Sequence, residues 1–198
     1  GLARVGVTSR FAGVITTPGI AFLARSGSYG AGVMISASHN PYQDNGIKVF
    51  GPTGYKLSDE EEVRIEQRIL ALLAEGLQPE PALLETDDSL ARTYCDYLAK
   101  TFPGSLNGLR LVLDCAHGAA YSLGPALFRR LGAQVTAIGC SPNGRNINQD
   151  CGSLHIAGLR ERVLAERADL GVAFDGDADR AIFIAGDGRM ADGDAVLW

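Results

Sequence analysis

From residue 109 onward the sequence alternates between short apolar segments and amphipathic ones, and this alternation constrains the fold more than any other feature. Apolar segments predict strands at 110–115, 134–139, 169–174 and 180–185. Amphipathic segments between them predict helices at 121–131 and 156–167. Strands that alternate with helices form a parallel or mixed sheet covered by helices. The fold class is therefore α/β.

The first part of the chain shows shorter segments. The pattern predicts strands at 14–16, 32–35 and 46–50 and a helix at 20–25, with a turn at Thr17–Gly19. The segment 32–35 contains only glycine and apolar residues, which predicts a strand buried on both faces.

A capped helix is expected from Ser58 to Glu75. Ser58 and Glu61 form a capping box, and Gly76 ends the helix. Its apolar positions share one face: Ile65, Ile69, Leu72 and Leu73. Residues 77–88 then predict a linker, and a second amphipathic helix carries Leu90, Tyr94, Tyr97 and Leu98. We therefore expect two α/β domains, at 1–88 and 89–198.

Composition excludes several classes of protein. With 46% hydrophobic and 21% charged residues, the chain of 198 residues can bury a core and is not a disordered segment. A net charge of −5 disfavours a nucleic-acid partner, and the longest apolar runs are too short for a bilayer. The four cysteines form no CxxC pair, which favours a reducing, cytoplasmic location. Both ends lie within patterned sequence, so we expect a piece of a longer protein.

The segment Asp175–Arg180 carries the strongest chemical signal. Asp175, Asp177 and Asp179 alternate with small residues directly after a predicted buried strand, so an extended backbone would point them the same way. Three close carboxylates repel one another and favour a bound cation, and oxygen ligands select Mg²⁺ or Ca²⁺. The spacing does not match an EF-hand loop. A solvated acidic turn is the alternative.

A second polar loop, Ser36–Asn45, also follows a predicted strand. Ser38 is a candidate nucleophile if a base, a metal or a phosphorylated state supports it, and a plain serine turn is the alternative. Lys48 follows shortly after and could bind a phosphate or move a proton. A phosphoryl group on Ser38 would supply a further oxygen ligand to a metal held by the aspartates.

A third loop spans residues 141–155. A loop of this length within a compact domain suggests a function or an interface. The three histidines are not spaced as metal ligands. His117 and His155 are expected to be ordinary loop or packing residues, and the cysteines small apolar ones.

These segments resemble the α-D-phosphohexomutase superfamily. The resemblance rests on Gly32–Pro41, Asp44–Lys48 and Asp175–Arg180, and the loop at 142–148 with Cys151–Ser153 is similar to the glucosamine branch. It implies two mixed α/β sandwich domains of the phosphohexomutase type, domain I in part and domain II, whereas family members have four domains. Sugar-recognition and phosphate-binding domains would lie outside the chain, which would then be poorly active or inactive alone.

The resemblance also implies a reaction. The enzyme would be an Mg²⁺-dependent isomerase that interconverts glucosamine 6-phosphate and glucosamine 1-phosphate through a phosphoserine and a sugar bisphosphate. Ser38 would carry the phosphoryl group and bind the metal with Asp175, Asp177 and Asp179. His39 and Lys48 would take part in proton transfer, with Arg180 beside the triad. Ala178 departs from the glycine that many members have there.

Three other functions stay open from the sequence. One is a phosphomannomutase or phosphoglucomutase of the same superfamily. Another is a phosphatase or phosphotransferase in which Asp175 is the nucleophile. The third is a non-catalytic module that binds Mg²⁺ or Ca²⁺. The oligomeric state is not predicted.

Overall fold

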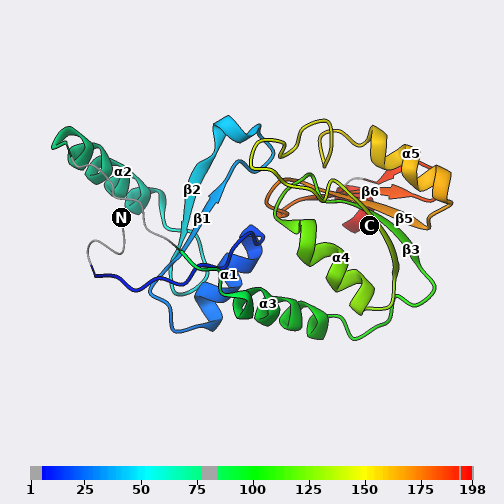
Figure 1. Cartoon of the computed structure of the whole chain (residues 1–198), viewed down its shortest axis with the longest axis horizontal. Helices are drawn as coiled ribbons and strands as arrows, with labels where there is room; N and C mark the ends of the chain where they lie inside the picture. The colour runs from blue at the N-terminus through cyan, green and yellow to red at the C-terminus, as the bar shows by residue number, and fades with distance from the viewer. Residues whose placement is uncertain (1–5, 77–83, 192, 198) are drawn as a thin grey trace.

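The computed structural model describes residues 6–76, 84–191 and 193–197, and two sheets organise them (Figure 1). The larger sheet contains β3 (Arg110–Asp114), β4 (Gln134–Ile138), β5 (Leu170–Phe174), β6 (Ala181–Ala185) and β7 (Met190–Ala191). Its strand order is β4-β3-β5-β6-β7. The strands β4, β3 and β5 are parallel, whereas β6 is antiparallel to β5 and to β7. The predicted mixed sheet is confirmed.

Helices cover both faces of this sheet. Side chains alternate along β3, so Leu111 and Leu113 pack in the core cluster that includes Ala120 of α4 (Ala120–Arg130). Val112 instead packs with Leu159 of α5 (Ala157–Glu166). A strand covered on both sides must be apolar throughout, which explains the continuous apolar run in β3.

The smaller sheet pairs β1 (Gly32–Ser36) with β2 (Gly46–Phe50) in antiparallel register, and the short η2 (Tyr42–Asp44) lies between them. The prediction that the 32–35 strand is buried on both faces is wrong for the described residues, since Val33 and Ile35 are 46% and 68% exposed. The apolar residues of β1 favour burial on both faces. Among the described residues, however, only one edge of the strand is paired and only part of one face is covered.

The predicted strand at 14–16 and the turn that follows it are also wrong. Thr16 is instead the N-cap of α1 (Thr17–Ser26), and its Oγ1 accepts a hydrogen bond from the Gly19 N–H. Pro18 lies in the first helical turn, where its missing N–H costs nothing. The helix therefore begins three residues before the predicted start.

The helix α3 (Asp88–Thr101) joins two halves of the molecule. The first half contains α1 and the smaller sheet, and the second half contains the larger sheet with α4 and α5. Leu90 and Tyr94 of α3 pack with Ile15 and Leu23, in or next to α1, in one core cluster. The helix also contacts α4 of the second half. The division at residue 88 remains a prediction, because α3 packs against both halves.

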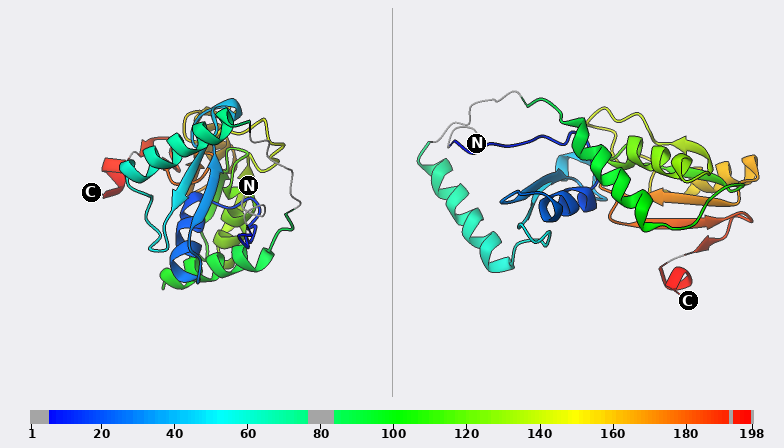
Figure 2. Two further views of the ribbon diagram at one scale, coloured as in Figure 1. Left: turned by 90° about the vertical axis from the view of Figure 1, so that its left-hand side faces the viewer. Right: turned by 90° about the horizontal axis from the view of Figure 1, so that it is seen from below.

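The helix α2 (Asp59–Ala74) has the predicted capping box and projects at one end of the molecule (Figures 1 and 2). None of its described side chains is buried, so its predicted apolar face is uncovered here. The greater part of the predicted linker at 77–88 lies outside the described residues. Near the chain end, α6 (Gly193–Leu197) follows β7. Among described residues no helix has both the length and the apolar character needed to cross a bilayer.

Candidate active site

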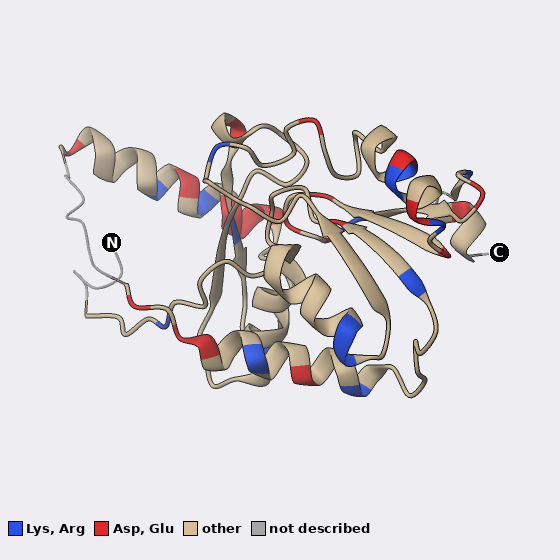
Figure 3. Ribbon diagram, turned by 45° about the vertical axis from the view of Figure 1, so that its right-hand side comes forward, with Lys and Arg blue, Asp and Glu red and all other residues tan. Residues whose placement is uncertain are grey.

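Two loops and a helix start meet where the two halves of the molecule touch. One loop follows β1 and carries Ser38, and the other joins β5 to β6 and carries the three aspartates. The Gly176 N–H donates to the Ser38 carbonyl at 3.0 Å, and the Thr17 N–H donates to the Asp177 carbonyl at 3.0 Å. Figure 3 shows acidic residues gathered at this junction, in the middle of the molecule. The backbone itself therefore fixes the Ser38 loop against the aspartate loop.

The three predicted metal ligands form a tight cluster. One oxygen each from Asp175, Asp177 and Asp179 lies within 4.8 Å of the others. Asp175 and Asp177 are fully buried, whereas Asp179 is exposed. Burial raises the pKa of Asp175 to about 6, and the negative charges of Asp177 and Asp179 add to the effect. The cluster has the excess negative charge that a cation would neutralise.

Asp177 is the carboxylate of the three that accepts short hydrogen bonds from two side chains. Its Oδ2 accepts hydrogen bonds from Lys48 Nζ and from Thr17 Oγ1, each at 2.6 Å. Burial alone would raise the pKa of Asp177, but these two donors outweigh it and lower the pKa below its usual range. Asp177 is therefore ionised at neutral pH.

The other oxygen of Asp177 provides a test of metal binding. Within the described part of the chain Oδ1 is buried and has no hydrogen-bond partner. An unpartnered buried carboxylate oxygen is costly unless something else binds it. Together with the convergent oxygens of Asp175 and Asp179, it offers the hard oxygen donors that Mg²⁺ prefers. The residues present therefore fit a magnesium ion.

Ser38 lies directly beside this cluster. Its Oγ is 3.4 Å from Asp175 Oδ2, although the two residues are 137 positions apart in sequence. Its φ of 53° is in the left-handed region that non-glycine residues rarely adopt, and its N–H donates to Ser36 Oγ at 2.8 Å. Such strain persists only where the surroundings hold it, and it is common at active sites.

The other predicted site residues lie at different distances from the cluster. Lys48 Nζ is also 3.5 Å from Asp179 Oδ2. Burial acts to lower the pKa of Lys48, but the bond to Asp177 prevails and the pKa is raised. His39 has a buried Nδ1 that lacks a partner among the described residues. The N–H of Arg180 donates to Asp175 Oδ1 at 3.2 Å, whereas its guanidinium is largely exposed, 3.8 Å from Asp179.

Sequence reasoning missed two residues of this site. Thr17 was assigned to a turn, yet its hydroxyl binds Asp177. Asn148 was noted only as part of the 141–155 loop, yet its side-chain amide donates to the carbonyls of Ser38 and Asn40 at 2.8 Å each. The sequence Thr16-Thr17-Pro18 could have predicted the start of a helix at Thr17, because threonine is a common N-cap and proline is common in the first helical turn. His117 has a structural role as expected, because its Nδ1 accepts the Ser141 N–H.

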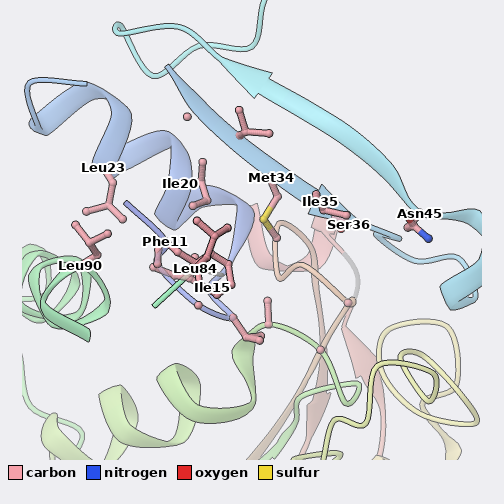
Figure 4. A pocket seen from close by; sticks show the side chains of 18 of the residues that line it. Phe11, Ile15, Ile20, Leu23, Met34, Ile35, Ser36, Asn45, Leu84 and Leu90 are labelled. Carbon is pink, nitrogen blue, oxygen red and sulfur yellow. The ribbon is translucent and has the colours of Figure 1, made fainter. Parts of the chain in front are cut away.

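A cavity of about 870 Å³ lies next to the Ser38 loop (Figure 4). The side chains that surround it are mainly apolar, among them Phe11, Ile15, Ile20, Leu23 and Met34. A sugar phosphate needs hydrogen-bond partners and positive charge, which this lining supplies poorly. The carboxylate cluster, not the cavity, is the centre of the candidate site.

Comparison with known proteins supports the resemblance. A model described as phosphoglucomutase/phosphomannomutase, alpha/beta/alpha domain I, matches residues 1–75, and the model of domain II matches residues 92–188. The chain belongs to the phosphoglucomutase/phosphomannomutase family. The predicted fold class, two mixed α/β domains of the phosphohexomutase type, is confirmed.

Curated relatives in this family are named phosphoglucosamine mutase. The chain is 55% identical over 197 residues to that of Solibacter usitatus, covering 100% of the chain and 44% of the relative. It is 48% identical over 204 residues to that of Mycobacterium tuberculosis, covering 100% of the chain and 45% of the relative. The chain therefore spans less than half the length of these relatives.

Solved structures of the family agree with the fold. A phosphoglucomutase/phosphomannomutase family protein from Burkholderia thailandensis superposes with a TM-score of 0.77 at 25% identity, over 96% of this chain and 43% of the other. A phosphomannomutase-like structure from Thermus thermophilus gives a TM-score of 0.75 at 25% identity, over 97% and 45% of the two chains.

Proposed function

We propose that this chain provides the phosphoserine and the metal ligands of a phosphoglucosamine mutase. The enzyme would interconvert glucosamine 6-phosphate and glucosamine 1-phosphate through a sugar bisphosphate. The observation that carries the proposal is the approach of Ser38 Oγ to Asp175 Oδ2 at 3.4 Å. It brings the candidate nucleophile to the cluster that fits Mg²⁺. The names of the curated relatives support the choice of sugar.

In this proposal Ser38 alternately carries and releases a phosphoryl group. Its P–O bond breaks as a sugar hydroxyl forms the new one, and the departing Ser38 oxygen must be neutralised by a proton. Lys48 is suited to stabilise or protonate that oxygen, because its raised pKa keeps it charged at neutral pH. A protonated ammonium has no lone pair with which to accept the proton of the sugar hydroxyl. His39, with its unpartnered Nδ1, is the candidate base.

Asp175, Asp177 and Asp179 would hold the Mg²⁺, and the Ser38 phosphate would complete its ligands. When bound, the ion withdraws charge from the phosphoryl oxygens during transfer. A related fold supports this assignment, since an Aspergillus fumigatus N-acetylphosphoglucosamine mutase has been solved in complex with GlcNAc-6P and magnesium. Thr17 orients Asp177 for this role. A cytoplasmic location would fit the four free thiols.

The proposal is tested by loading Ser38 from a sugar bisphosphate. The chain is incubated with Mg²⁺ and either glucosamine 1,6-bisphosphate or mannose 1,6-bisphosphate, and the phosphorylated peptide is quantified by mass spectrometry. Because the sugar-recognition domain would lie outside the chain, we expect slow loading of Ser38 from both compounds, and at least a hundredfold loss of that rate in Asp177→Asn. Asp169→Asn is the matched control, because Asp169 pairs with Arg110 away from the site. Loading of Asp177→Asn at the wild-type rate, or no loading of the unsubstituted chain from either compound, would contradict the proposal.

A further inference from the structure

The loop at 141–155 contains a residue that reaches into the site from the second half of the molecule. We propose that Asn148 is a positioning residue that holds the Ser38 loop against the aspartate loop. It touches neither the candidate metal ligands nor the Ser38 hydroxyl among the contacts of the described residues. Its consequence for phosphoryl transfer rests on the function proposed above, whereas its effect on the loop does not.

Both N–H bonds of the Asn148 side-chain NH₂ group are used in this contact. Its Nδ2 donates one hydrogen bond to the Ser38 carbonyl and another to the Asn40 carbonyl, both at 2.8 Å. The residue is 9% exposed, so water competes little with these bonds. Both acceptors are carbonyl oxygens, and the two N–H bonds of the amide NH₂ group satisfy both of them at once. An aspartate of the same shape would set a carboxylate against those two oxygens.

Asn148 is itself anchored to the core of the larger sheet. Its N–H donates to the Ala116 carbonyl at 2.8 Å. Asp114, the last residue of β3 and 1% exposed, accepts hydrogen bonds from the N–H groups of Ala116 and Gly152. One buried carboxylate thus fixes both Ala116, the backbone partner of Asn148, and Gly152, which follows Asn148 in the same loop. The amide that binds the Ser38 loop is therefore supported by β3, the most buried strand of the larger sheet.

The Ser38 loop needs such support because of its backbone conformation. Ser38 has a positive φ, which is unfavourable for a residue with a Cβ and must be imposed by its surroundings. Its carbonyl accepts from the Gly176 N–H and from Asn148. Removing the Asn148 amide leaves Gly176 as the partner of that carbonyl and frees the Asn40 carbonyl. We infer that the Ser38 hydroxyl then leaves its position beside Asp175.

The test uses Asn148→Gly and Asn148→Asp. Asn148 has a φ of 58°, so glycine keeps its backbone conformation while removing the amide. Asn146→Ala is the matched control, because within the described part of the chain the hydrogen bonds of the Asn146 side chain stay in the same loop, to Asn143 and Ser141. Melting temperatures verify that each variant is folded. Hydrogen exchange is measured on a peptide covering residues 37–40, and Ser38 loading is measured from glucose 1,6-bisphosphate with Mg²⁺.

We expect exchange at residues 37–40 to be at least tenfold faster in both Asn148 variants and unchanged in Asn146→Ala. The maximal rate of Ser38 loading should fall at least tenfold, more in Asn148→Asp than in Asn148→Gly, with the half-saturating bisphosphate concentration unchanged. Unchanged exchange in a folded Asn148→Gly would overturn the positioning role. If the unsubstituted chain loads no phosphate, the proposed function fails, and the exchange result still decides the role of Asn148.

Discussion

The Thr17 hydroxyl donates a 2.6 Å hydrogen bond to Asp177 Oδ2, across 160 positions of sequence. The same oxygen accepts a hydrogen bond from Lys48 Nζ, so the first half of the molecule satisfies Oδ2, while Oδ1 has no partner among the residues that the structure describes. Oδ2 of Asp177 therefore binds the first half of the molecule, and Oδ1 stays available to bind a cation. The candidate site therefore forms only when both halves are in contact.

Replacing Thr17 with valine tests this bond with almost no change of shape. A buried carboxylate that loses a donor is destabilised, so we expect Thr17→Val to lower the free energy of unfolding by about 1–3 kcal/mol. Chemical denaturation measures the change. Thr93→Val is the control, because the Thr93 hydroxyl makes an exposed bond to the Ser89 carbonyl on α3, and it should change stability by no more than about 0.5 kcal/mol. Equal effects would contradict the assignment.

Lys48 and a bound metal ion act on the same carboxylates with the same sign of charge. Lys48→Met removes a cation that lies 2.6 Å from Asp177 and 3.5 Å from Asp179. We therefore expect Mn²⁺, used as a probe for Mg²⁺, to bind about tenfold more tightly, because Coulomb repulsion is removed. Phosphoryl transfer to Ser38 should slow in the same variant.

Isothermal titration calorimetry measures the Mn²⁺ affinity. Lys56→Met is the matched control, since Lys56 pairs with Glu62 on α2 and should leave the affinity unchanged. Weaker Mn²⁺ binding in Lys48→Met would show that the lysine supports the metal site by orienting Asp177 and not by competing with the ion.

The raised pKa of Asp175 predicts a pH dependence of stability without divalent ions. The carboxyl titrates near 6 when folded and near 3.9 when unfolded, so the folded state binds more protons between these values. Stability should therefore fall as pH rises from about 4 to 6. Asp175→Asn should flatten this part of the profile. A wild-type profile that rises over the same range, relative to Asp175→Asn, would contradict the assignment.

Ala178 occupies a left-handed backbone position in the aspartate loop, with a φ of 55°. Glycine adopts this conformation without a steric penalty, so Ala178→Gly should raise the free energy of unfolding by about 1 kcal/mol. The control is Ala181→Gly in β6, where glycine should destabilise the strand by about 1 kcal/mol. Thermal melting of the two variants should therefore shift in opposite directions, and a lower melting temperature for Ala178→Gly would refute the strain.

The sequence predicted the features that local pattern determines. The strands β3 to β6 and the helices α4 and α5 follow from periodicity, whereas β7 and α6 were not predicted. The aspartate and serine motifs follow from residue type and spacing. The sequence misses the start of α1 because residues 14–16 favour a β-branched strand and Thr17–Gly19 a turn, although a threonine before proline also suits a helix N-terminus. Here the capping hydrogen bond to Gly19 decided between the two.

The contacts of Thr17 and Asn148 could not be predicted from the sequence alone. They join segments 160 and 110 positions apart, and no local pattern encodes which loops meet. Likewise, the apolar run of β1 indicates that the strand favours burial, but it does not say which residues cover it. Residue chemistry suggests that Ser38 meets the aspartates, the family resemblance strengthens that hypothesis, and the structure adds the atoms that hold them together.

The central claim is that Ser38, and not Asp175, accepts the phosphoryl group. The most direct measurement treats the chain with glucose 1,6-bisphosphate and Mg²⁺, then compares the phosphate on wild type, Ser38→Ala and Asp175→Asn before and after hydroxylamine. Hydroxylamine cleaves acyl phosphates and leaves phosphoserine intact. We predict a hydroxylamine-resistant phosphate on Ser38 that is absent from Ser38→Ala. A hydroxylamine-sensitive phosphate that persists in Ser38→Ala and disappears in Asp175→Asn would contradict the account.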